Sequence, residues 1–134
     1  MREKEGTLRA IHLLRQALDR DPSYGPALGA ASICQMQLRV GGWSNDLEAS
    51  RRQSVDLARR ALRVAGGDPD VLACAAYSLG YFGEDIAAAL ALMDRALELN
   101  PSFADGWRWS GWIRLWAGQP DTWRTAGPQA RSGY

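Results

Sequence analysis

The sequence predicts an all-α fold of about six helices, and three observations support this prediction. Apolar residues recur at the three- and four-residue spacing of an amphipathic helix through most of the chain. No convincing stretch alternates polar and apolar residues with the two-residue period of a half-buried strand. Proline and glycine separate the helical stretches.

The apolar stripes place the helices in order along the chain. Leu8, Ile11 and Leu18 share one face of the first helix, and a similar stripe runs from Ile86 to Leu97 in the fifth. The Glu84-Asp85 pair opens the fifth helix, where acidic side chains favour the helix dipole. The expected helices span roughly residues 5–20, 24–40, 46–65, 69–82, 84–99 and 103–117.

Helix breakers agree with these limits. Asp21-Pro22, Asp68-Pro69 and Asn100-Pro101 each follow one expected helix and open the next, because proline cannot continue a helix but suits its first turn. Glycines end the other helices, at Gly41-Gly42, Gly66-Gly67, Gly83 and Gly118.

The bulk composition describes one globular domain without an extreme charge. The chain has 134 residues, 46% of them apolar, and a net charge of +1, so nothing in the charge balance favours nucleic acid or an anionic membrane as a partner. Apolar runs are too short for a membrane span, and the charged N-terminus is unlike a signal peptide. We therefore expect a cytoplasmic protein, with Cys34 and Cys74 as reduced, packed thiols.

A repeat is visible around the prolines. The phrases DPSYGPAL, DPDVLACA and NPSFADGW resemble one another. Upstream, Ala10, Leu14 and Ala17 precede Pro22 with the same spacing as Ala89, Met93 and Ala96 before Pro101, and Ser54, Ala58 and Ala61 echo the pattern between them. Small residues at these positions allow a second helix to approach closely.

These features make the chain similar to tetratricopeptide repeat proteins, whose signature is W-x2-L-G-x2-Y on one helix and A-x3-F with a later proline around the next. Trp107 and Gly111 match the first motif, although Ser110 and Arg114 replace its Leu and Tyr. The resemblance covers roughly residues 7–118. It implies a right-handed α-α superhelix of antiparallel helix pairs over residues 1–118, followed by an irregular tail at 119–134.

The resemblance also implies a concave inner surface that holds a protein or peptide partner. The expected wall is mostly apolar and aromatic, which suits an apolar helix or an extended apolar peptide better than an acidic peptide terminus. Carried over helix by helix, the wall comprises Ile33, Met36, Gln37, Cys74, Ser78, Tyr81, Phe82, Arg108, Trp112 and Trp116.

The tryptophan-rich stretch WRWSGWIRLW divides between two helix faces. Trp109, Trp112 and Trp116 fall on one stripe, whereas Trp107 lies nearly opposite them with Gly111. The stripe either contacts a partner or packs against the preceding repeat, and the sequence leaves both interpretations open.

Both ends of the array lack a pairing helix. The helix at 5–20 is expected to be the second of a pair, and the helix at 103–117 the first. We therefore expect a homo-oligomer in which one end completes the other. The residues expected in this self-association are Leu14, Ala17, Trp107 and Gly111.

The sequence contains no recognisable signature of a catalytic, metal or cofactor site. His12 is the lone histidine, and neither a phosphate-binding glycine loop nor paired helical histidines are found. The arginines between Arg51 and Arg63 are expected on the solvated face of an amphipathic helix. We predict a non-catalytic protein-interaction or assembly module that binds no cofactor, nucleic acid or membrane.

A second resemblance suggests an alternative function. DRALELNPSFADGW followed by WSGWIRLWAGQPD is similar to the repeat region behind the catalytic part of some bacterial adenylate or guanylate cyclase-like proteins. That likeness implies a regulatory or sensory segment whose groove binds a small apolar ligand.

Overall fold

The computed structural model describes residues 2–118 and contains six α-helices in that range. They are α1 (Arg2–Arg20), α2 (Gly25–Val40), α3 (Leu47–Ala65), α4 (Pro69–Tyr81), α5 (Ile86–Leu99) and α6 (Ala104–Trp116). All-α architecture with about six helices is confirmed. The N-terminus of α1 differs most from the prediction, because the helix extends back to Arg2. The tail expected at 119–134 lies outside the described residues.

Aspartate side chains fix the starts of three helices. The carboxylate of Asp46 accepts a hydrogen bond from the Ala49 N–H at 3.0 Å, and Asp85 accepts one from Ala88 at 3.0 Å. Asp68 caps α4 in the same manner. These contacts satisfy N–H groups that the first turn of a helix leaves unpaired.

Glycines in the left-handed region end α2 and α4. Gly42 and Gly83 have φ values of 71° and 67°, which L-residues with a side chain rarely adopt. The chain reversal lets the Trp43 N–H reach the Leu38 carbonyl at 2.9 Å and the Glu84 N–H reach the Leu79 carbonyl at 3.2 Å. Both are the long backbone bonds of a Schellman termination.

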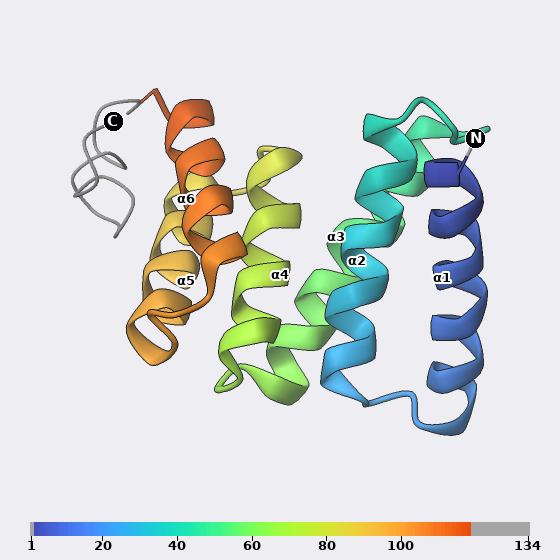
Figure 1. The fold of residues 1–134 in the computed structure, drawn as a ribbon, viewed down its shortest axis with the longest axis horizontal. Helices are drawn as coiled ribbons and strands as arrows, with labels where there is room; N and C mark the ends of the chain where they lie inside the picture. The colour runs from blue at the N-terminus through green and yellow to red at the C-terminus, as the bar shows by residue number, and fades with distance from the viewer. Residues whose placement is uncertain (1, 119–134) are drawn as a thin grey trace.

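Figure 1 shows α1 at one end of the molecule and α5 and α6 at the other, with α2, α3 and α4 between them. Each helix packs against the next, and α2 also contacts α4, as α4 contacts α6. The even-numbered helices therefore form one layer, with α3 and α5 packed on it. None of the helices within residues 2–118 combines the length and the apolarity needed to cross a membrane.

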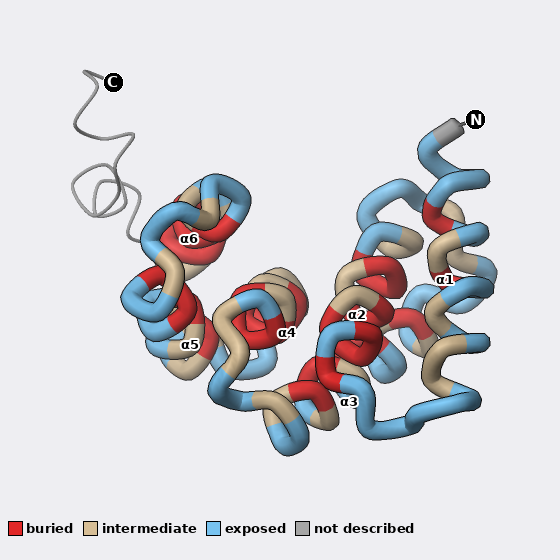
Figure 2. The backbone as a smooth tube through the Cα atoms, turned by 60° about the horizontal axis from the view of Figure 1, so that its bottom comes forward, coloured by how far each residue is buried: buried red, intermediate tan, exposed pale blue. Residues whose placement is uncertain are grey.

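The core is built largely from small side chains. Ala58 on α3 and Ala89 on α5 are fully buried against the large residues Leu72, Met93 and Ile113. A Cβ atom at Gly80 would lie only 3.1 Å from the Ile113 side chain, so α4 and α6 approach closely at that point. In Figure 2 the buried positions concentrate on the inward sides of α2 to α6.

Candidate interaction surfaces

An aromatic stack joins α4 to α6. The ring of Tyr77 lies between the indoles of Trp109 and Trp116, with centroid distances of 4.8 and 5.6 Å and interplanar angles of 4° and 13°. Positions i and i+7 of a helix are about 10.5 Å apart. That spacing leaves room for one ring between two parallel rings, so Tyr77 fills the gap on α6.

Further rings extend this stack toward the C-terminal ends of both helices. Trp112 stacks on Trp116 at 6.5 Å, and Tyr81 meets the same indole edge-on at 5.6 Å. Tyr81 also meets Phe82 edge-on at 4.9 Å. We call this set the aromatic surface, and its members are Tyr77, Tyr81, Phe82, Trp109, Trp112 and Trp116.

The aromatic surface is partly accessible. Trp112 is its most exposed member, with 48% of its surface accessible, and the other five rings are half-buried. Burial raises the pKa of the Tyr77 hydroxyl, although the charge of Arg108 acts in the opposite direction. Arg108 is exposed and paired with Asp105 at 2.7 Å, so it places a cation at the rim.

Trp109 and Trp112 thus differ. Trp109 is held between Tyr77 and the edge-on ring of Phe103, which is the packing alternative that the sequence left open. Among the described residues, the aromatic ring that Trp112 contacts is that of Trp116 on its own helix. About half of the Trp112 surface stays exposed. Of the two indoles, Trp112 is the one available to a partner.

The residues expected on the concave wall do not all lie together. Tyr81, Phe82, Trp112 and Trp116 meet in the aromatic surface. Gln37 is exposed and instead lines a hollow of about 580 Å³ between α1 and the end of α2. Ile33 is half-buried on α2, whereas Met36 is 4% exposed and belongs to the interior.

Ser78 is fully buried and therefore cannot line an open wall as expected. Its hydroxyl oxygen lies 2.7 Å from that of Ser32, which donates to the Ser54 carbonyl. The residue on the open side is Tyr77, one position earlier.

Cys74 is half-buried, and its side chain packs toward α2. A Cβ at Gly29 would meet the Cys74 Cβ at 3.3 Å, so the side chain faces α2. Burial is the main cause that raises the pKa of the Cys74 thiol to about 12, and burial also raises that of Cys34. Both cysteines are free, as the sequence predicted.

Trp107 and Arg114 face α5. The Trp107 indole N–H donates to the Pro101 carbonyl at 2.8 Å, and its ring packs against the core. Arg114 is buried at a position where the repeat signature has tyrosine, and it donates to the Asp94 carboxylate at 2.5 Å. Gly111 is also buried. Trp107 is therefore half-covered within its own chain.

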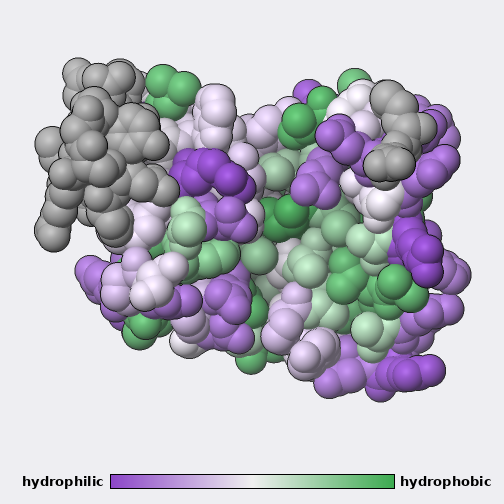
Figure 3. All heavy atoms as spheres, in the orientation of Figure 1, coloured by the Kyte–Doolittle hydropathy of each residue, from purple (hydrophilic) through white to green (hydrophobic). Residues whose placement is uncertain are grey.

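One flank of α1 is uncovered in comparison with its counterparts. Ala89, Met93 and Ala96 on α5 are at most 1% exposed, and the matching positions on α3 are fully buried. Ala10, Leu14 and Ala17 occupy the same positions of α1 but remain partly exposed. Figure 3 shows apolar side chains gathered over α2 and its border with α1.

The arginines of α3 are mostly paired with acids. Arg51 bridges Glu48 and Glu84 at 2.7 and 3.1 Å, and Arg60 lies 3.8 Å from Asp56. This arrangement is a solvated, charge-balanced face. Within residues 2–118, no group of three or more His, Cys, Asp or Glu side chains is arranged to hold a metal ion.

Comparisons with protein-family models, with characterised proteins and with solved structures give no significant match for this chain.

Proposed function

We propose that this chain is a tetratricopeptide-like helical repeat that acts as a non-catalytic protein-interaction module in the cytoplasm. The aromatic surface on α4 and α6 is the observation that carries this proposal. Its rings offer a large apolar area with polar edges, the composition that dominates binding hot spots. The helix-pair order, in which α2, α4 and α6 contact one another in sequence, also supports a repeat of this kind.

The preferred partner is an apolar helix or an extended apolar peptide. Trp112 would insert into it, because this indole is the most exposed ring and its neighbour Trp116 holds it from one side. Arg108 places a cation at the rim, but it is paired with Asp105. A strongly acidic peptide would therefore gain little on this surface.

A selection from a displayed peptide library tests this function. Trp112→Ala should lose the selected peptides, while Leu115→Ala should keep them. Leu115 is a matched control because it is also 48% exposed and lies on the same helix outside the aromatic surface. Trp116→Ala is less informative, since it also breaks the stack on Tyr77. The proposal fails if the peptides bind Trp112→Ala as tightly as the unchanged protein.

A second copy of the chain is a further partner for α1. Ala10, Leu14 and Ala17 on α1 occupy the positions that are covered by a pairing helix on α3 and α5, and two of the three are small. On α6 the exposed Leu115 occupies a position like that of Met36, which is buried in α2. We propose that α6 of one copy packs on α1 of the next, head to tail.

Light scattering across a concentration series tests this self-association. The mass should rise with concentration for the unchanged chain and stay monomeric for Ala17→Glu, which places a charge on the flank. Gln16→Glu adds the same charge on an exposed position of α1 and should behave like the unchanged chain. A monomer throughout the high micromolar range would rule out the head-to-tail contact while leaving the peptide-binding function intact.

A further inference from the structure

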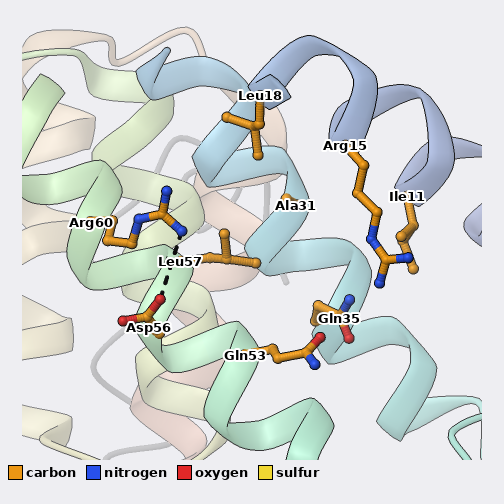
Figure 4. Close-up of a pocket in the computed structure, with 9 residues that line it drawn as sticks. All are labelled: Ile11, Arg15, Leu18, Ala31, Gln35, Gln53, Asp56, Leu57 and Arg60. Atoms are coloured by element: carbon orange, nitrogen blue, oxygen red, sulfur yellow. Dashed lines mark ion pairs between the residues drawn. The ribbon is translucent and has the colours of Figure 1, made fainter. Parts of the chain in front are cut away.

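A hollow lies between α1 and α3, with α2 as its floor (Figure 4). Its volume is about 270 Å³. A second hollow of about 390 Å³ shares Ile11, Arg15, Gln35 and Gln53 with it and continues to the N-terminus of α3. The hollow is lined by α1, α2 and α3, whereas the aromatic surface belongs to α4 and α6. Neither the repeat motif nor the proposed function explains the residues that line it.

Gln35 is the unusual residue in this hollow. It is only 6% exposed, yet its side-chain amide makes no hydrogen bond with a described residue and lines the open space. The Gln35 amide is not among the atoms that are buried without a partner, so it reaches the open space of the hollow and can bind a group that enters it.

Two further polar groups point toward the same place. Figure 4 shows the Arg15 guanidinium and the Gln53 amide gathered around Gln35, so α1, α2 and α3 contribute one polar group each. Arg15 has no carboxylate partner among the described residues. Asp56 is in the lining, but it is 3.8 Å from Arg60 and forms its ion pair there.

The rest of the lining is apolar. Leu18, Ala31 and Leu57 form the wall away from Arg15, with Ile11 beside it. A ligand that fits this hollow thus needs an acceptor-rich head for one guanidinium and two amides, and a short hydrocarbon part for the opposite wall. A guanidinium fork matches the two oxygens of a carboxylate, and amide NH₂ groups can donate to its remaining lone pairs.

We propose that this hollow is a binding site for a carboxylate that bears a short apolar tail. Arg15 holds the carboxylate, Gln35 and Gln53 donate to it, and Leu18 and Leu57 contact the tail. Either a free carboxylic acid or the C-terminal residue of a peptide supplies this chemistry. The site stands independently of the partner proposed for α4 and α6.

Titration with hexanoate, followed by NMR of the backbone and side-chain amides, tests the site. Hexanoate should produce saturable shifts at Gln35 and Gln53 with a dissociation constant on the order of 1 mM or tighter. Hexanamide has the same tail without the charge and should bind at least about tenfold more weakly, since it cannot pair with Arg15. A peptide ending in leucine, with a free or an amidated C-terminus, then distinguishes the two sources.

Variants complete the test. Arg15→Gln should weaken hexanoate binding by about tenfold or more, whereas Arg9→Gln, on an exposed position of the same helix, should leave it unchanged. Gln35→Leu should lose binding but keep the fold, because leucine has a similar volume and no amide to donate. The proposal is overturned if hexanoate causes no saturable shift, if hexanamide binds equally well, or if Arg15→Gln and Arg9→Gln behave alike.

Discussion

The rings of Tyr77 and Trp109 are stacked 4.8 Å apart and only 4° from parallel, although they belong to different helices. Trp116 covers the other side of Tyr77 at 5.6 Å. The stack couples the half-exposed aromatic surface to the packing of α4 against α6. Stability and the shape of the candidate binding surface therefore depend on the same side chain.

Replacing Tyr77 by leucine should lower the free energy of unfolding by about 2 kcal/mol. The change removes two aromatic contacts and leaves a gap between the indoles. Urea unfolding measures the loss, and tryptophan emission should shift to longer wavelength in the folded variant. Tyr77→Phe keeps the ring and should be nearly neutral, because no hydrogen bond from the hydroxyl is found in residues 2–118. Equal stability for both variants would contradict this role of the stack.

Replacing Ser32 by alanine should destabilise the fold by about 1–2 kcal/mol. Its hydroxyl donates to the Ser54 carbonyl at 2.9 Å and lies 2.7 Å from the Ser78 hydroxyl oxygen, so it links three helices in a fully buried position. Ser102→Ala, in the exposed turn before α6, provides the comparison. Thermal unfolding should show a clear loss for the first variant alone, and two matching curves would count against the buried link.

The Arg114–Asp94 pair predicts an asymmetric mutational effect. Asp94→Ala leaves a buried guanidinium without its carboxylate and should cost about 1–3 kcal/mol, less than the roughly 3–5 kcal/mol of a fully buried pair, because Asp94 is half-exposed. Arg114→Met removes the buried charge and should cost less. It also removes the Arg114 Nε, which is buried and has no hydrogen-bond partner within residues 2–118.

A double-mutant cycle on this pair gives the decisive measurement. The variant with both changes should be about as stable as Arg114→Met alone, because Asp94 matters only while the guanidinium is present. Additive losses would show that the two side chains act separately.

Cys74 predicts a loss of stability at alkaline pH. Its thiol pKa is raised to about 12 in the folded protein from an ordinary value of 9.0. A raised pKa means that the folded state binds the proton more tightly than the unfolded chain. The contribution is complete below about pH 9 and is lost as the pH rises toward 12. Unfolding measured across that window should show a shallower decline for Cys74→Ala, and parallel curves would contradict the assignment.

Local chemistry made the helices predictable from the sequence. Asp46, Asp68 and Asp85 cap their helices through contacts two or three residues away, and Gly42 and Gly83 end theirs through the local φ angle. None of these depends on distant parts of the chain. The helix limits therefore agreed with the structure within two residues, apart from the start of α1.

Part of the candidate site could also be predicted from residue spacing in the sequence. The i, i+3, i+7 spacing separated Trp109, Trp112 and Trp116 from Trp107, and the structure keeps that division. Tyr77 was missed, although Tyr77 and Tyr81 lie four residues apart on one helix face and could have indicated an aromatic stripe on α4. Carrying the repeat resemblance over helix by helix gave Ser78 instead.

The sequence by itself determined an all-α chain of six helices, their caps and the amphipathic faces of most of them. Tertiary structure alone decided that Tyr77 fills the space between two indoles, that Ser78 is buried beside Ser32, and that Gln35 opens into a hollow without a partner. The physical reason is the distance along the chain over which each feature is determined. A cap or a stripe depends on neighbours within one or two turns, whereas these three environments depend on where another helix lies.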